Sequence, residues 1–459
     1  MMSSPQRQQS SSASAATMPG LATAAVVYSS LVLTVLYRHS RAGLELRDFR
    51  DGIYYAVVAL LHGDNPYDTP HYLQTYPVEQ GYSPYAPGFL SLHFPFGLLP
   101  FETAQNAYFI VLCGLGLGLG LIAWRYATRE VNLAAALFLA TALLLSRPGS
   151  WNVGLGQYAL QFSIGAALAL CIEPQRYRLA GLGCAITLLK PTYGVPLSLL
   201  LLSSGRVRIW LVGVAVAVLL SLPPGIAVLK AAGGFIPLLN SLHASFANFS
   251  SDTTAGAATG PERVDVIGLV GFGLGYEPSA ALEVVLTLGV LACGSLCFHR
   301  IVKAAGGQVS PLALVVGCLT ILVCTYHQTY DLVLLLVPVT AWAHTLISDD
   351  RRRASSVALL LLLLFPMVNY LSPQAVQASL GIRGLASSVL TRANALALTM
   401  AFGLALTLTT RTSQASAARS TSRLVPRSRG RSRAAPLSPQ SPGSWWPLRC
   451  CRTAPASTW

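Results

Sequence analysis

Two acidic residues, Asp48 and Asp51, stand three positions apart in an aromatic stretch that runs from Arg47 to Tyr55. Residues with this spacing share one face of a helix, so a short helix here would point both carboxylates in the same direction. A carboxylate held beside a bound hydroxyl group can remove its proton, which is the role of a general base. We interpret one of the two acids, preferably Asp48, as the acid–base group of the protein.

The composition places these acids in a membrane protein. Of 459 residues, 53% are hydrophobic and only 10% are charged, and the mean hydropathy is +0.54. A soluble domain usually carries about 25% charged residues. Apolar runs of about 20 residues are long enough to cross a bilayer as helices. We therefore predict an all-α polytopic membrane protein, a bundle of about 10–12 transmembrane helices.

Apolar runs recur along the chain and are separated by short basic clusters. The first run follows a polar N-terminus and lacks a convincing cleavage site, so we interpret it as a retained helix and not as a signal peptide. The runs lie at 21–37, 106–124, 131–146, 157–172, 209–229, 278–298, 310–325, 331–347, 354–371 and 386–409.

The same pattern divides the chain into three parts. Residues 1–20 are rich in Ser, Gln and Ala, and residues 411–459 are rich in Ser, Arg and Pro, so both are predicted to be disordered cytoplasmic ends. Residues 21–410 form the membrane domain, in which residues 38–105 are a long first outer loop. Prolines beside aromatic residues predict that this loop forms short helices at the membrane surface.

The net charge of +14 indicates orientation in the membrane and not a nucleic-acid partner, because much of it lies in the tail and in short loops. Basic loops usually face the cytoplasm. Most basic clusters agree with a cytoplasmic N-terminus, although the arginines between residues 38 and 50 do not. This orientation brings a set of polar residues to the outer face, namely Asp48, Asp51, Trp151, Asn152, Gln157, His327 and Asp331.

Lys190 and Pro191 interrupt the apolar stretch 179–204. Each half holds roughly 12 residues, or about 18 Å of helix, which is too short to cross a bilayer perpendicularly. We interpret the stretch as a hairpin of two short helices with Lys190 at membrane depth. A lysine there is costly unless it faces a cavity or a partner, so a functional role is the first hypothesis.

The nine cysteines do not predict a metal site. Most of them lie within apolar runs, and none has the paired spacing of metal ligands, which is typical of small buried cysteines. We therefore expect neither a metal nor a cofactor.

An ordered set of short motifs resembles a known family. The motifs are Asp48-Phe49, Tyr54-Tyr55, Gly63-Asp64-Asn65-Pro66-Tyr67-Asp68, Tyr85-Ala86-Pro87, Phe96-Gly97-Leu98-Leu99-Pro100, Gly156-Gln157 and Leu189-Lys190-Pro191-Thr192. They cover roughly residues 40–210. They resemble the polyprenol-phosphate-mannose-dependent α-mannosyltransferases, the GT87 group of the GT-C superfamily, which also includes arabinofuranosyltransferases. The chain has one proline at Pro87 where the family has two, and Ala159 where the family has Asn.

The resemblance implies a GT-C-like helix bundle whose first outer loop carries the catalytic carboxylate. It implies a sugar phosphate on a polyprenol chain as the donor, a glycolipid or glycan as the acceptor, and membrane lipids around both. In an inverting transfer, Asp48 would take the acceptor proton. Lys190 and His327, and more weakly Arg147, would stabilise the leaving phosphate. The site would lie on the extracytoplasmic face of the plasma membrane.

The candidate residues fall into two groups. The candidate catalytic residues are Asp48, Asp51 and His327. The candidate substrate-binding residues are Tyr54, Tyr55, Asn65, Tyr67, Tyr85, Trp151, Asn152, Gln157, Lys190, Tyr330 and Asp331.

Most of these residues also have a structural interpretation. Asp48 could lie in a solvated loop or cap a helix, and His327 could belong to a polar turn. Asp331 is expected to cap the helix that begins there, and Gln157 could cap a helix or join two helices. For the Tyr and Trp residues, an aromatic belt at the membrane interface is favoured over stacking on sugars.

Three classes of function remain open. The favoured one is a glycosyltransferase that moves mannose, or alternatively arabinofuranose, from a polyprenyl-phosphate donor. A transporter or flippase of lipid-linked sugars would need paired broken helices in two related halves, whereas the sequence shows one broken element. A non-catalytic membrane scaffold would leave the polar residues at the outer face unexplained.

Overall fold

The computed structural model describes residues 17–42, 45–251, 256–348 and 354–424. The chain divides after Ser413, and the described part of the segment that follows is the end of the last helix. The predicted disorder of residues 1–16 and 425–459 falls outside the described residues. The last helix continues to Leu424, beyond residue 411, at which the predicted tail begins.

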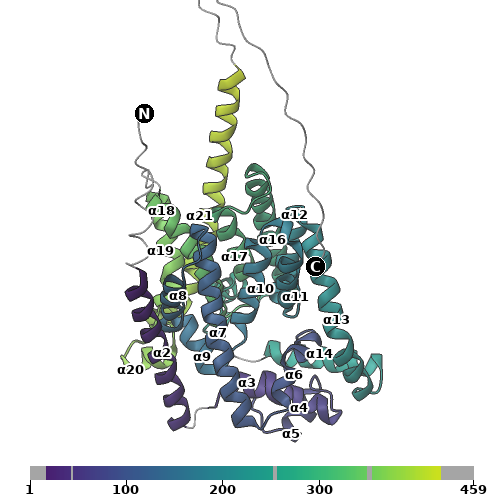
Figure 1. Ribbon diagram of the computed structural model, residues 1–459. Helices are drawn as coiled ribbons and strands as arrows, with labels where there is room; N and C mark the ends of the chain where they lie inside the picture. The colour runs from purple at the N-terminus through teal and green to yellow at the C-terminus, as the bar shows by residue number, and fades with distance from the viewer. Residues whose placement is uncertain (1–16, 43–44, 252–255, 349–353, 425–459) are drawn as a thin grey trace, which may run out of the picture. The chain divides into compact units, whose positions relative to one another are not determined.

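Among the described residues, all regular elements are helices (Figure 1). The helices outside the first outer loop are α2 (Thr17–Ala42), α7 (Phe101–Thr128), α8 (Leu133–Leu145), α9 (Arg147–Leu155), α10 (Ala159–Cys171), η2 (Pro174–Arg176), α11 (Tyr177–Leu188), α12 (Pro191–Ser203), α13 (Val207–Ala231), α14 (Phe235–Ser251), α15 (Val266–Leu274), α16 (Ala280–Ala304), α17 (Pro311–Cys324), η3 (Thr329–Leu335), α18 (Leu336–Ser348), α19 (Ala354–Val368), α20 (Gln374–Ser379) and α21 (Gly384–Leu424).

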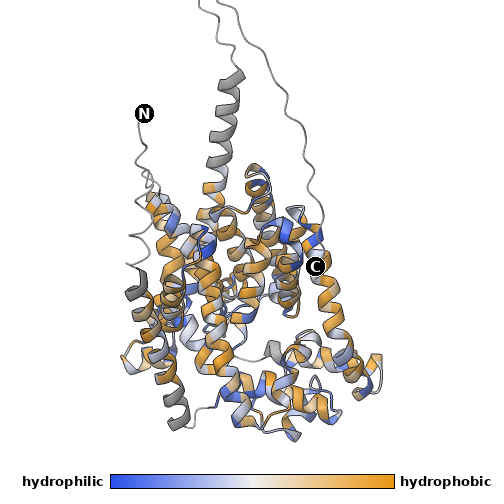
Figure 2. Ribbon diagram, in the orientation of Figure 1, coloured by the Kyte–Doolittle hydropathy of each residue, from blue (hydrophilic) through white to orange (hydrophobic). Residues whose placement is uncertain are grey.

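Five described helices are long and apolar enough to cross a membrane. They are α7, α13, α16, η3 together with α18, and α21 as far as Thr410. The pair α8–α9 adds a sixth if it counts as one bent span, and the other apolar helices are shorter, at 10–17 residues. Apolar residues dominate these helices (Figure 2). The protein is therefore an all-α polytopic membrane protein, as the composition predicts.

The first outer loop folds into short helices between α2 and α7. They are α3 (Arg47–Phe49), the π-helix η1 (Arg50–Tyr54), α4 (Tyr55–His62), α5 (Thr69–Thr75) and α6 (Gly88–Gly97). Left-handed Gly63 ends α4, as glycine commonly does. Asp68 begins α5 by accepting a hydrogen bond from a backbone N–H in its first turn. Figure 1 shows α3–α6 gathered at one end of the long helices.

Aromatic packing fixes the start of this loop against α7. The ring of Phe49, which is fully buried, stacks on Tyr108 of α7 with ring centroids 4.6 Å apart. Phe96 of α6 meets the same Phe49 ring edge-on at 5.8 Å. Because each such ring buries a large apolar surface, these contacts hold the backbone that carries Asp48 in one place.

Two breaks in the helices create polar backbone inside the bundle. Helices α8 and α9 meet at an angle of 76°, where the hydroxyl of Ser146 accepts a hydrogen bond from the N–H of Gly149 at 3.2 Å. Helices α11 and α12 are separated by Lys190, whose backbone is extended. Pro191 can start a helix but cannot continue one from the preceding turn. The predicted pair of short helices is therefore present.

Candidate active site

Asp48 lies on α3 with its side chain almost entirely buried, and one turn of π-helix follows it. The side-chain amide of Gln157 donates a hydrogen bond to its carboxylate, and the guanidinium of Arg47 lies 3.7 Å away. Burial raises the pKa of the Asp48 carboxyl to about 6, although Arg47 and the Gln157 amide both lower it. π-Helical turns are frequent at functional sites. The structure therefore supplies a carboxylate that titrates near neutral pH.

Gln157 reaches Asp48 because α9 ends in a left-handed glycine. Gly156 has a φ of +72°, and a Cβ there would stand 2.7 Å from Leu46 and 2.8 Å from Phe49. Only glycine allows both this conformation and this approach. The N–H of Gln157 then donates to the carbonyl of Asn152 at 2.8 Å, so the end of α9 presents the Gln157 side chain to α3.

Asp51 has a different environment from Asp48. Its carboxylate accepts from Arg50 Nε at 2.7 Å and from the backbone N–H groups of Glu79 and Gln80 at 3.2 and 3.1 Å. Its carbonyl oxygen accepts from the hydroxyl of Tyr72 at 2.7 Å. These partners all belong to the first outer loop, so Asp51 holds the loop together, and its catalytic role remains a prediction.

A second polar centre surrounds the buried carboxylate of Asp331. One oxygen accepts from Lys190 Nζ at 2.7 Å and from the Tyr193 hydroxyl at 3.1 Å. The other lies 2.9 Å from His327 Nδ1 and accepts from the N–H of Gln328 at 3.2 Å. Asp331 therefore caps the helix η3, which begins at Thr329, and its carboxylate also joins Lys190, 141 residues away, to nearby His327.

His327 is completely buried, with a partner at each ring nitrogen. Nδ1 faces the Asp331 carboxylate, and Nε2 lies 3.3 Å from the carbonyl oxygen of Thr192. The ring of Tyr193 meets the imidazole edge-on at 4.8 Å. These three contacts fix the orientation of the imidazole.

Backbone pairing holds the His327 segment against the loop before α15. Arg263 and Gln328 form an isolated antiparallel bridge, and the N–H of Val264 donates to the His327 carbonyl at 3.0 Å. Glu262 accepts from the Arg147 guanidinium at 3.1 Å and from the Thr329 hydroxyl at 2.7 Å. The polar turn predicted around His327 is thus a fixed piece of backbone.

The residues of α9 connect the two polar centres. The amide of Asn152, which is fully buried, donates to the carbonyl of Tyr330 at 2.7 Å. The ring of Trp151 lies between the guanidinium of Arg147, at 4.0 Å, and the ring of Tyr330, at 6.1 Å. Lys190 Nζ lies 5.7 Å from the same Tyr330 ring. Cations beside aromatic faces are stabilised electrostatically, so this side of the site alternates cations and rings.

Tyr85 contacts two other buried tyrosines. Its hydroxyl is 2.7 Å from that of Tyr158, and its carbonyl accepts from the hydroxyl of Tyr67 at 2.6 Å. Burial raises the pKa of the Tyr85 hydroxyl, and the charges of Asp331 and Asp48 add to this rise. Tyr85 is therefore within electrostatic reach of both acids, and Tyr67 holds it there.

Three other predicted substrate-binding residues lie in contacts within the loop. Tyr54 donates from its hydroxyl to the Leu99 carbonyl at 3.0 Å, and Tyr55 stacks on Phe101 at 6.0 Å. Asn65 accepts from the N–H of Tyr67 at 3.1 Å in a local turn. These contacts join them to residues of the loop and to Phe101 of α7, and not to Asp48 or Asp331.

Sequence reasoning missed several residues that build the site. Tyr158 and Tyr193 are buried between the predicted residues, and Glu262 pairs with Arg147. Tyr193 stands three residues after Lys190, a spacing that puts both side chains on one face of a helix, so its role was readable from the pattern. Glu262 gave no such signal, because its partner is 115 residues away.

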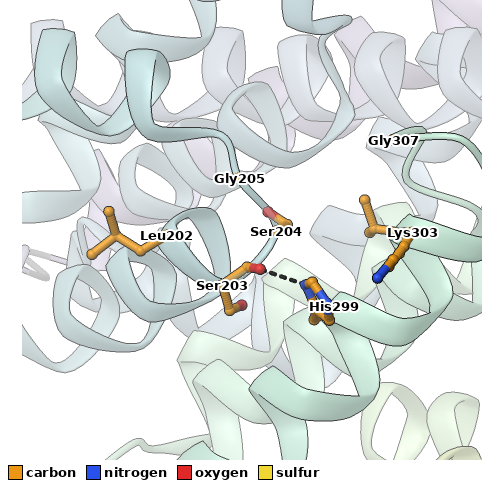
Figure 3. A pocket seen from close by; sticks show the side chains of 8 residues that line it. Leu202, Ser203, Ser204, Gly205, His299, Lys303 and Gly307 are labelled. Carbon is orange, nitrogen blue, oxygen red and sulfur yellow. Dashed lines mark hydrogen bonds between the residues drawn. The ribbon is translucent and has the colours of Figure 1, made fainter.

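The surface pocket lies apart from the two polar centres. Among the described residues, no group of three or more His, Cys, Asp or Glu could hold a metal ion. A pocket of about 370 Å³ lies where α12 and α16 end (Figure 3), lined by Leu202, Ser203, Ser204, Gly205, His299, Val302, Lys303 and Gly307. The pocket is at the far end of α12 from Lys190, about 20 Å along the helix.

The fold and the site together define an integral membrane protein with two buried acid centres joined by a broken helix. The sequence model of glycosyltransferase family 87 matches residues 84–325, which is more than half of the 459 residues. The chain belongs to glycosyltransferase family 87. Neither a search of curated proteins nor a search of solved structures returns a match.

Membership of the family makes the protein a glycosyltransferase, which acts on a sugar donor and an acceptor. The matched segment contains Tyr85, Trp151, Gln157 and Lys190, whereas Asp48 precedes it, and His327 and Asp331 follow it. Asp48 and Asp331 therefore lie outside the matched segment, and they contact it through Gln157 and Lys190, respectively.

Proposed function

We propose that the protein transfers a mannosyl residue from a polyprenyl-phosphate donor to a lipid-linked glycan on the extracytoplasmic face of the inner membrane. The transfer inverts the anomeric centre, and Asp48 acts as the general base. The observation that carries this proposal is the buried Asp48 carboxylate, with a pKa raised to about 6, oriented by Gln157 from the family-matched segment.

The chemistry of Asp48 suits a single displacement. As the acceptor oxygen forms its bond to the anomeric carbon, Asp48 takes the hydroxyl proton, and the bond from that carbon to the phosphate oxygen breaks. The electron pair leaves with the polyprenyl phosphate. A general base is most effective when its pKa lies near the working pH, and a carboxyl that titrates at about 6 is mostly ionised at pH 7. Gln157 keeps the ionised oxygen in one orientation.

The Asp331 centre is the part of the site suited to the leaving phosphate. Lys190 has three donors, and its hydrogen bond to Asp331 engages one of them. His327 and Tyr193 are fixed by the same carboxylate. Preorganised donors stabilise developing charge without having to reorganise. In this proposal Lys190 faces the phosphate, and His327, whose two ring nitrogens are engaged by Asp331 and Thr192, positions Asp331 beside it.

The aromatic residues between the centres suit a sugar ring. Tyr85 lies within electrostatic reach of both acids, and Trp151 and Tyr330 form an edge-to-face pair beside Lys190. Aromatic faces combine an apolar surface with a polar tip. We assign the donor sugar to the space that these rings border, with Asn152 holding Tyr330 in place.

The proposal is tested by sugar transfer with the purified full chain in liposomes. Polyprenyl-phosphate-mannose is the donor, and a membrane glycolipid extract is the acceptor. Wild type is expected to transfer mannose, and folded Asp48→Asn is not. Glu79→Gln is the matched control, because Glu79 lies in the same loop and is exposed.

The other outcomes separate the alternatives. If wild type is inactive with mannose but active with a polyprenyl-phosphate arabinofuranose donor, the sugar assignment is wrong and the base assignment stands. If neither donor is used and labelled lipid-linked sugar instead crosses the bilayer, the protein is a flippase. Full activity of Asp48→Asn would show that Asp48 is not the base.

A further inference from the structure

Helix α14 has a surface that neither the fold nor the proposed transfer explains. We propose that α14 lies in the membrane interface, with Phe235, Leu239 and Phe246 inserted among the lipids, and that it thereby anchors the Tyr82–Tyr85 segment of the site. The partner is the lipid bilayer itself, on the side of the protein where the first outer loop lies. This inference does not depend on the sugar that is transferred.

The three apolar residues form one stripe along the helix. Positions 235, 239 and 246 differ by four and seven residues, which places them within about 40° of one another on an α-helix. Their side chains are all exposed, with Phe235 at 64%, Leu239 at 43% and Phe246 at 61% of full exposure. A stripe of this kind, which is not covered by the protein's described residues, needs an apolar partner.

Two other faces of α14 have different surroundings. Leu238, Leu242 and Ser245 turn toward the protein, where the two leucines pack against the hydrophobic core and Ser245 is buried. The opposite face carries Asn240 and Ala244, both exposed, and exposed Ile236 lies at its edge. A helix with one face on protein, one apolar stripe and one small or polar face has the pattern expected at a bilayer surface.

The position of α14 along the chain puts it beside the membrane. The span α13 ends at Ala231, and only residues 232–234 separate it from α14. Three residues reach at most about 14 Å across their four virtual bonds, so Phe235 stays near the boundary where α13 leaves the bilayer. The outer side of α13 is already apolar and exposed at Leu219, Leu222 and Ile226. The stripe on α14 therefore continues a lipid-facing surface.

The spacing of the stripe decides how α14 lies. Phe235 and Phe246 are eleven residues apart, which is about 16 Å along the axis. A helix that continued straight out of the bilayer would carry Phe246 that far into water. Contacts with α5 and with the end of α13 instead keep α14 beside the first outer loop (Figure 1). Only a helix that lies along the surface places both phenylalanines among lipids.

A hydrogen bond connects the anchored helix to the site. The hydroxyl of Ser245 donates to the carbonyl of Tyr82 at 3.1 Å. The ring of Tyr82 meets those of Tyr67 and Tyr85 at 5.0 and 6.3 Å. Insertion of the stripe on one side of α14 therefore steadies the Tyr82–Tyr85 segment on the other side.

Spin-label accessibility in liposomes tests the insertion. Nitroxide labels are placed at Leu239→Cys and Phe246→Cys, with Ala244→Cys as the matched control on the opposite face and unsubstituted protein to measure labelling of the native cysteines. Labels at 239 and 246 are expected to collide several-fold more with oxygen than with a water-soluble nickel complex, at a depth of about 5–10 Å. The label at 244 is expected to show the reverse.

Two results would overturn the proposal. Equal exposure of positions 246 and 244 to the nickel complex would place the stripe in water. Shielding of 246 from both reagents would mean that protein, and not lipid, covers it. As a second measurement, Phe246→Asn is expected to increase hydrogen exchange of residues 79–86 in liposomes, whereas Ala244→Asn is not. An unchanged exchange rate in Phe246→Asn would refute the anchoring of the site segment.

Discussion

Removing the hydrogen bond between Gln157 and Asp48 tests the proposed base without removing the base itself. In Gln157→Leu, the carboxylate keeps its place on α3 but loses the amide that stabilises its ionised form. The pKa of Asp48, already raised to about 6 by burial, should therefore rise further. Activity that requires ionised Asp48 should then need a higher pH.

The size of the effect follows from the strength of such a bond. A hydrogen bond to a charged group contributes about 1.5–3 kcal/mol, and each pH unit corresponds to about 1.4 kcal/mol. The acid limb of kcat/KM should therefore move from about pH 6 to about pH 7–8. If it moves to 7.5, kcat/KM at pH 6.5 falls about eightfold, whereas the loss nearly disappears at pH 9.

The assay is the initial rate of sugar transfer between pH 5 and pH 9, in liposomes buffered on both sides. Gln161→Leu is the matched control, because Gln161 is also a buried glutamine at the start of α10 but has no hydrogen bond to Asp48. The control should keep its acid limb at about pH 6.

The result that would refute the reasoning is an acid limb that stays in place in Gln157→Leu while activity falls equally at every pH. Gln157 would then act on substrate binding and not on the ionisation of Asp48. A limb that moved equally in both glutamine variants would point to a general loss of packing around α10.

Four further results are expected. Asp48→Asn should lower kcat at least about 100-fold at pH 7 and above without lowering the melting temperature. Because burial raises the pKa of Asp48 in the folded state, its contribution to the free energy of unfolding is fully present below pH 4. This contribution is lost as pH rises through about 6, a fall of about 3 kcal/mol. The free energy of unfolding of Asp48→Asn should not show this fall. Gly156→Ala should destabilise the fold by at least about 1–2 kcal/mol and move the acid limb as Gln157→Leu does, measured by thermal unfolding and a pH profile. Lys190→Met should destabilise by about 3–5 kcal/mol because Asp331 is left unpaired, and adding Asp331→Asn should restore most of that loss in a double-mutant cycle.

The parts of the site that the sequence predicted well are those with a local signal. Lys190 before Pro191 in an apolar stretch indicated a break with a buried cation, because proline lacks the N–H that would continue the preceding helix. Asp331 at the start of an apolar run indicated a helix cap, which the contact with the Gln328 N–H confirms. Neither signal revealed that these two residues bind each other across 141 positions.

The difference between Asp48 and Asp51 could not be predicted from spacing. Three residues apart, both were expected on one face of a helix. A π-helical turn begins between them, and Asp51 instead accepts hydrogen bonds from the backbone of Glu79 and Gln80. Two features decide where each carboxylate points. One is the change from an α-helical to a π-helical turn, and the other is the backbone at residues 79 and 80 that binds Asp51. Neither can be read from the spacing of the two acids.

The sequence alone determined that the chain is an all-α polytopic membrane protein, because the transfer of apolar side chains out of water is nearly additive along the chain. It also determined where the chain must break. Only the tertiary structure decided which acid meets Gln157, 109 residues away, and which cation meets Asp331. Such pairs depend on how helices pack and on the exact approach that Gly156 allows, and these are properties of the assembled bundle.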